Sequence, residues 1–286
     1  MLTTLKGILP AAREGRYAVP GFDYTEDVMV RAILETAERL RSPVIMMCLD
    51  LELESDGGNG WVYMAGLVRA VAEHHDIPIV LHYDHGSSLD NAKKAIDLGF
   101  TSVMIDGSAL PFEENIAQTA KVVELAAPHG VSVEAELGFV GGFDLRQSEH
   151  KGNVLTEPSE AVEFVKQTGV DALAVSIGTA HGTYQSEPTL NIERLKELRE
   201  AVSIPLVLHG GSGTPDDQIR ESIRNGICKL NIFADERQAM YRGLKRSATI
   251  HNRPDPLPEE MFRPIKEELS GVIEEKIKLC GSDGHA

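Results

Sequence analysis

Short apolar runs alternate along the chain with segments of helical periodicity, and polar, glycine-rich loops separate the two. The apolar runs are rich in Val, Ile and Leu, which is typical of strands buried on both faces of a parallel sheet. The eight runs that predict strands are, in order, Tyr17–Asp23, Pro43–Leu49, Pro78–Tyr83, Thr101–Ile105, Val131–Leu137, Asp171–Ile177, Pro205–His209 and Ile227–Ile232.

Segments with helical spacing of their apolar residues follow these strands. After the first strand, Val28, Ala32, Leu34 and Ala37 are among the apolar positions of such a segment. The other predicted helices cover Val62–His75 and Ala92–Leu98, begin after Pro111 and Pro158, follow the last three strands, and end with Glu259–Leu279. One long irregular loop is expected over Gly138–Thr156.

Eight strand–helix units without a break in composition predict an α/β protein, a (β/α)₈ TIM barrel. We expect residues 1–286 to form a single domain with an extra C-terminal helix. The alternative is an open doubly wound sheet, but no G-x-G-x-x-G motif follows the first strand. The polar residues also lie at the ends of many strands, which a barrel brings to one face.

Charge and cysteine content narrow the function. The 28 basic and 44 acidic residues give a net charge of −16, which disfavours nucleic acid and anionic membranes as partners. A phosphorylated substrate would therefore need backbone N–H groups, helix N-termini or a metal ion to hold it. Three widely spaced cysteines and the absence of a signal-like N-terminus or a membrane-length apolar run predict a cytoplasmic protein.

Three histidines are expected at the mouth of the barrel, where the carboxyl ends of the strands meet. His85, His181 and His209 each precede a glycine, which lets the backbone turn sharply beside the side chain. A single histidine at a strand end is more often a structural hydrogen bonder, and we expect that role for His82. Three together, with an open fourth position, are typical of a catalytic zinc or similar divalent ion.

Carboxylates accompany the histidines at the strand ends. Asp84 and Asp106 end the third and fourth strands, and Glu134 and Glu136 alternate with apolar residues in the fifth. Inward-pointing carboxylates need a partner, because an unpaired buried charge is unfavourable. A nearby metal cation and a salt bridge to Lys229 would both meet that need.

Two glycine-rich stretches complete the predicted mouth. Gly178–Gly182 and His209–Gly213 can present consecutive N–H groups to an anion, although such stretches are also common as plain turns. Their place after the sixth and seventh strands, beside the histidines, favours phosphate binding.

The segments LHYDHG, SVMIDGS, VEAELG, VDALAVSIGTAHG, PLVLHGGSG and CKLNI, in this order, resemble the class II ketose-bisphosphate aldolases, in their fructose- and tagatose-bisphosphate branch. The resemblance covers nearly the whole chain. It implies a lyase that cleaves a ketose bisphosphate reversibly to dihydroxyacetone phosphate and an aldehyde, with zinc and, in some members, Na⁺ or K⁺. Cobalt or manganese in place of zinc stays open. A homodimer or homotetramer is implied as well.

The resemblance also implies roles for individual residues. His85, His181 and His209 would bind zinc, Asp84 would transfer the proton, and Asp106 and Glu136 would hold a second or displaced metal ion. The residues that would contact the substrate are Gly182, Gly210, Gly211, Ser212 and Asn231.

Four stretches depart from the family pattern, all where substrate is held. Asp23 replaces an amide in VPGFD, Asp50 lies in the altered stretch CLDLELESDGG, and Phe233 and Ala234 stand in NIFAD, where a hydroxyl is usual. In the loop after the fifth strand, Asp144 or Glu149 would replace the usual acidic cluster. We therefore expect a substrate different from fructose or tagatose bisphosphate, such as a ketose monophosphate or an unphosphorylated ketose.

Two other functions fit parts of the pattern. Three histidines could serve a metal-dependent hydrolase, and loss of the usual loop glutamate would suit a non-catalytic partner protein. The ordered motifs disfavour the first, and the retention of every metal position disfavours the second.

Overall fold

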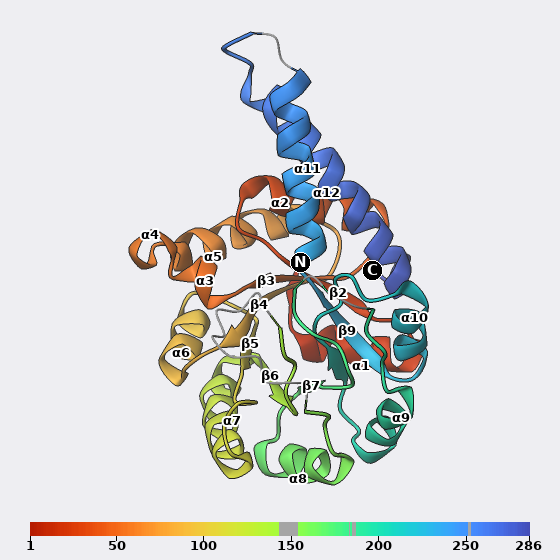
Figure 1. Ribbon diagram of the computed structural model, residues 1–286. Coiled ribbons are helices and arrows are strands. Elements are labelled where there is room, and N and C mark those ends of the chain that lie inside the picture. The colour runs from red at the N-terminus through yellow and green to blue at the C-terminus, as the bar shows by residue number, and fades with distance from the viewer. Residues whose placement is uncertain (143–153, 183, 185–186, 251–252) are drawn as a thin grey trace.

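Eight parallel strands close into a barrel in the computed structural model, which describes residues 1–142, 154–182, 184, 187–250 and 253–286 (Figure 1). Each strand pairs with its neighbour along the chain, β9 pairs with β2, and the pairing of β4 with β5 completes the ring. The strands are β2 (Val19–Asp23), β3 (Val44–Cys48), β4 (Ile79–Gly86), β5 (Ser102–Ile105), β6 (Ser132–Leu137), β7 (Ala172–Val175), β8 (Leu206–Leu208) and β9 (Ile227–Ile232). The predicted (β/α)₈ barrel is confirmed.

Helices cover the outside of the barrel, as the 3.6-residue periodicity predicts. Apolar side chains of each strand that point outward pack against the apolar face of these helices and form the larger of two cores. The helices between the strands are α2 (Asp27–Arg39), α3 (Asp50–Leu53), α4 (Ser55–Gly58), α5 (Gly60–Val71), η1 (Ala72–His74), α6 (Leu89–Asp97), α7 (Phe112–Ala126), η2 (Ala127–His129), α8 (Pro158–Thr168), α9 (Ile192–Ala201) and α10 (Asp216–Arg224).

Two long helices follow the last strand. α11 (Ala234–Ile250) and α12 (Pro258–Cys280) pack side by side and extend beyond the barrel (Figure 1). Ion pairs between exposed side chains, such as Arg242 with Glu268 at 3.2 Å, add to this contact. The second of these is the predicted extra C-terminal helix. Within the described part of the chain, no helix is long and apolar enough to cross a membrane.

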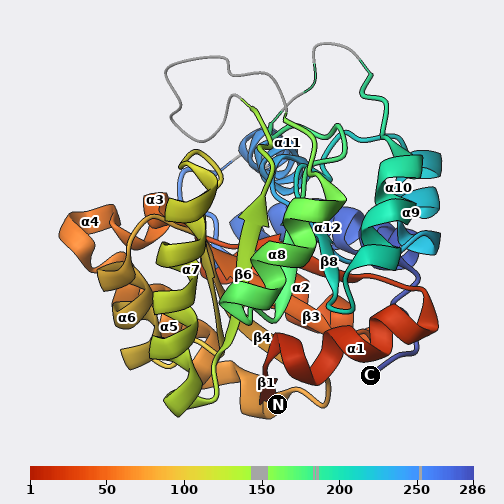
Figure 2. The ribbon, with the colours of Figure 1, turned by 90° about the horizontal axis from the view of Figure 1, so that it is seen from below.

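The N-terminal segment closes the end of the barrel at which the strands begin, and the sequence pattern did not predict this. β1 (Leu2–Thr3) pairs with β4, and α1 (Leu5–Gly15) lies across the amino ends of the strands (Figure 2). Its apolar face, with Leu5 and Leu9, packs on inward-pointing strand residues such as Val80, and this forms the second core. The barrel is therefore filled at this end and open to chemistry at the other.

The packing of α1 against the barrel predicts that loss of its buried side chains destabilises the fold. Leu9 is fully buried, so Leu9→Ala should lower the free energy of unfolding by about 2–5 kcal/mol, the usual effect of a cavity in a packed core. Urea unfolding measures the change. Leu110→Ala, on an exposed turn, is the control and should shift the same quantity by less than about 0.5 kcal/mol. Equal effects of the two substitutions would contradict the packing described for α1.

Candidate active site

Three histidines meet at the carboxyl ends of the strands. His85 ends β4, His181 follows β7, and His209 follows β8 directly. Their ring centroids lie 4.6–5.8 Å apart, and one nitrogen of each ring lies within 4.8 Å of the others. The barrel therefore brings together the three residues that the sequence pattern picked out.

The backbone at the end of β4 aims His85 into this cluster. The β4–β5 register shifts between Tyr83 and Gly86, and His85 adopts a left-handed conformation with φ 46°. Such irregularities redirect a side chain at a strand end. Gly86 makes this possible, because a Cβ there would lie 2.3 Å from the carbonyl oxygen of Met104. Gly210 is similarly required, since it has φ 68° and approaches the Ala180 carbonyl oxygen.

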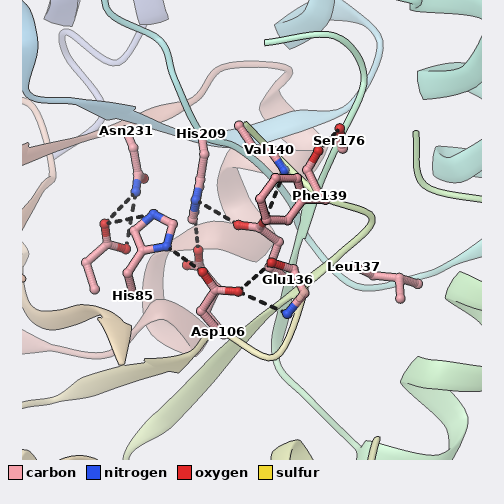
Figure 3. A network of polar contacts seen from close by, with 12 residues as sticks. His85, Asp106, Glu136, Leu137, Phe139, Val140, Ser176, His209 and Asn231 are labelled. Atoms are coloured by element: carbon pink, nitrogen blue, oxygen red, sulfur yellow. Dashed lines mark hydrogen bonds and ion pairs between the residues drawn. The ribbon is translucent and has the colours of Figure 1, made fainter. Parts of the chain in front are cut away.

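Carboxylates fix the orientation of two of the rings (Figure 3). His85 Nδ1 lies 3.0 Å from Asp106 Oδ2, and Asp106 accepts hydrogen bonds from the backbone and side chain of Ser108. His209 Nε2 lies 2.9 Å from Glu134 Oε1. A carboxylate on one ring nitrogen leaves the other nitrogen available as a ligand, as in metal sites generally.

Several buried atoms at this point have no hydrogen-bond partner in the described structure. They are His181 Nε2, His209 Nδ1 and Glu136 Oε2. Burial, and then the neighbouring His85 and His209, lower the pKa of His181 to about 3, so its ring is neutral. The neutral imidazole of His181 and the carboxylate of Glu136, each with a buried atom that makes no hydrogen bond in the described structure, fit a divalent cation.

Glu136 and Asp106 form a second possible ligand group with His85. One oxygen of each carboxylate and one nitrogen of His85 lie within 4.8 Å of one another. Glu136 Oε2 is also 3.3 Å from His209 Nδ1, so the two ligand groups share a wall. This arrangement suits a second or displaced position for the same cation.

The negative charge of Glu134, in contrast, is balanced by the positive charge of a lysine. Lys229 Nζ lies 2.8 and 3.1 Å from the two oxygens of Glu134, and both side chains are fully buried. Burial alone would raise the pKa of Glu134, but Lys229 and His209 outweigh it and lower the pKa. Of the two partners that the sequence allowed for the inward glutamates, the salt bridge serves Glu134, and Glu136 is left for a metal ion.

Asp84 is held as a buried carboxylate beside the histidines. Asn231 Nδ2 donates to both of its oxygens, at 3.2 and 3.0 Å, and His82 Nε2 lies 3.3 Å from Oδ1. Burial would raise the pKa of Asp84, but His85 and Lys229 lower it well below its usual range. His82 is itself fixed by Ser102 Oγ at 2.8 Å, so it supports Asp84 from below.

A pocket opens beside these groups at the carboxyl ends of the strands. It is lined by Asp23, Leu49, Asp84, His85, His181, Gly182, Gly210, Ser212, Asn231, Ile232, Phe233 and Ala234. Most of the substrate-binding residues expected from the sequence are in this set. Leu49 and Ile232 are additions, and as apolar residues at strand ends they gave no chemical signal in the sequence.

Two of the expected substrate residues lie elsewhere. Asp50 is not among the residues that line the pocket. Its carboxylate accepts hydrogen bonds from the Tyr83 hydroxyl and from Asn91 Nδ2, which joins β4 to α6. The N–H of Gly211 donates to the Asn231 carbonyl oxygen at 3.0 Å, so it ties β8 to β9. Asp144 and Glu149 lie outside the described residues.

Ser212 joins the glycine-rich turn to the start of α11. Its hydroxyl oxygen accepts hydrogen bonds from the N–H groups of Phe233 and Asp235, at 3.1 and 3.2 Å. The first N–H groups at this helix end are therefore satisfied within the protein.

The fold is a TIM barrel with a cluster of possible metal ligands at its mouth, and comparison with known proteins identifies the family. The family model "Fructose-bisphosphate aldolase class-II" matches residues 3–285. The chain therefore belongs to the class II fructose-bisphosphate aldolase family, whose members are lyases.

Individual relatives agree with this assignment. The fructose-bisphosphate aldolase of Giardia intestinalis is 38% identical over 312 residues, which cover 100% of this chain and 94% of the relative. The probable fructose-bisphosphate aldolase of Bacillus subtilis is 38% identical and is covered to 99%. Among solved structures, the YdjI aldolase of Escherichia coli has a TM-score of 0.88 at 35% identity, with both chains fully covered.

The three-histidine cluster predicts how the protein binds a divalent ion. We expect His85→Ala, His181→Ala and His209→Ala each to weaken binding of added Co²⁺ by roughly 100-fold or more, because loss even of a residue that only supports a ligand costs 10–100-fold. Visible absorption of the bound cobalt measures the titration. His129→Ala, on an exposed helix end, is the control and should bind as the unsubstituted protein does. Unchanged binding in all three variants would exclude this cluster as the metal site.

Proposed function

We propose that the protein is a zinc-dependent aldolase that reversibly cleaves a ketose phosphate to dihydroxyacetone phosphate and an aldehyde. The observation that supports this most directly is the convergence of His85, His181 and His209. Two of them, His85 and His181, line the same pocket as the buried carboxylate of Asp84. The family membership supplies the reaction type. A metal-dependent hydrolase could use the three histidines, but it would not need the Asp84–Asn231 pair.

The histidines would hold the metal ion, with Asp106 and Glu136 as ligands of a second position. When bound, a divalent cation polarises the ketone oxygen and stabilises the negative charge that develops on the ketone half of the substrate. Zinc is the preferred ion for an imidazole ligand set, and cobalt or manganese are the alternatives that binding experiments would reveal.

Asp84 would act as the proton-transfer group. In the cleavage direction its carboxylate accepts the proton of the C4 hydroxyl while the C3–C4 bond breaks. The electrons of the O–H bond then form the aldehyde carbonyl, and the pair from the broken bond stays with C3 until C3 is protonated. Asn231 Nδ2, which donates to both carboxylate oxygens, keeps Asp84 oriented toward the pocket.

The glycine-rich turns would hold the phosphate. Gly182, Gly210 and Ser212 line the pocket on the side of β7 and β8, where barrel enzymes commonly bind phosphate through backbone N–H groups. A sodium or potassium ion near this phosphate belongs to the same proposal. It suits a strongly acidic protein without a cationic side chain at this part of the described pocket.

The cellular setting is part of the proposal. The three cysteines are buried and unpaired, which is compatible with a reducing cytoplasm. We propose a homodimer or homotetramer that acts on small sugar phosphates, and neither nucleic acid nor a membrane as a partner.

Replacement of the proton-transfer group tests its role. Asp84→Ala should lower kcat for ketose cleavage by about 10²–10⁴-fold, the usual contribution of a general acid–base group. The bound metal should remain, because Asp84 is not one of the three histidine ligands. Coupled detection of dihydroxyacetone phosphate measures cleavage, and elemental analysis measures the metal. Full activity in the variant would contradict the assignment.

Removal of the metal tests the reaction class. Prolonged dialysis against a chelator should abolish cleavage of a panel of phosphorylated and unphosphorylated ketoses, and added Zn²⁺ should restore it. The products are expected to be a ketone and an aldehyde in equal amounts. Activity that survives chelation, or products of simple hydrolysis, would overturn the proposal.

A further inference from the structure

The carboxyl group of Asp23 lines the pocket without a partner on one oxygen. Asp23 is the last residue of β2 and is only 3% exposed, yet it borders the same pocket as Asp84 and Asn231. Its Oδ1 has no hydrogen-bond partner among the described residues. A buried polar atom in this condition is unfavourable unless a ligand pairs with it.

A second buried carboxyl group lies close to Asp23. Glu236 is the third residue of α11 and is fully buried, and no side chain in the described structure hydrogen bonds to its carboxyl group. Burial raises the pKa of Glu236 well above its usual range, and the nearby Asp23 raises it further. Burial also raises the pKa of Asp23, and the nearby carboxylates of Asp84 and Glu52 raise it further. The two side chains therefore form a buried acidic pair, of which only Asp23 lines the pocket.

The pocket lining around Asp23 offers no cationic side chain to an anion. Among the described residues that line the pocket, none is Lys or Arg. Lys229 lies inside the barrel, where Glu134 holds it at 2.8 Å. A phosphate beside Asp23 and Glu236 would add negative charge to a buried acidic pair, whereas a hydroxyl group brings a hydrogen-bond donor and no charge.

We infer that Asp23, with the buried carboxyl group of Glu236 beside it, binds a hydroxyl-bearing, uncharged part of the substrate, so that the ketose carries a single phosphate. This inference rests on the proposed aldolase function and adds the substrate class to it. The phosphate then occupies the glycine-rich turns across the pocket, and the free oxygen of Asp23 accepts a hydrogen bond from a substrate hydroxyl.

Substrate pairs that differ only by one phosphate test the inference. The metal-loaded enzyme is assayed with fructose 1-phosphate and fructose 1,6-bisphosphate, and likewise with tagatose 1-phosphate and tagatose 1,6-bisphosphate. We expect kcat/KM to favour each monophosphate by about tenfold or more. In Asp23→Asn combined with Glu236→Gln, the shapes are kept and the charges removed, so this preference should fall by at least about tenfold. Asp97→Asn, exposed and paired with Lys93, is the charge-matched control and should keep the wild-type ratio.

The outcomes separate this inference from the function on which it rests. Absence of cleavage of every ketose would overturn both. Cleavage with a preference for the bisphosphates, or an unchanged ratio in the double variant, would overturn the inference alone. A requirement for Na⁺ or K⁺ that disappears in the double variant would also overturn it, because the pair would then bind a cation. Thermal unfolding checks that the double variant is folded, and loss of activity on both esters with the ratio kept would also count against the inference.

Discussion

The buried pair of Lys229 and Glu134 is the interaction on which the interior of the barrel depends. Asp84, Glu134 and Glu136 all lie where an uncompensated charge is strongly unfavourable, and Lys229 supplies a cation among them. With Glu134 neutralised, its second role becomes possible, because the same carboxylate fixes His209. Lys229 thus contacts Glu134, and Glu134 in turn contacts His209, one of the three clustered histidines.

The site forms only when the barrel is closed. Asp84 comes from β4, its partners Lys229 and Asn231 come from β9, and Ser102, which fixes His82, comes from β5. The pairing of β4 with β5 also contains the irregularity that turns His85 into the cluster. Closure of the ring therefore brings these polar groups together, and a barrel opened at β4–β5 would lose the irregularity that orients His85 and the contact of Ser102 with His82.

The sequence predicts much of this arrangement because parallel strands bring their carboxyl ends to one face. That rule placed His85, His181 and His209 together although they are widely separated in the chain. The same rule could not decide the partners of individual carboxylates. Asp50 contacts Tyr83 and Asn91 because it begins the short helix α3, and the periodicity of the sequence does not show how such a short helix is placed. Glu236 was missed for a related reason. An acidic residue in the first turn of a helix usually faces solvent, and only the packing of α11 on the barrel buries it.

The two ends of the barrel differ in what fills them, because α1 covers only the end at which the strands begin. The end under α1 is filled with apolar side chains, and most of the packing inside the strands lies there. The other end holds charged and polar groups, among them those that line the pocket. Substitutions at pocket residues such as Asp23 and Phe233 leave the apolar packing under α1 untouched. The pocket can therefore be altered without rebuilding the scaffold that carries it.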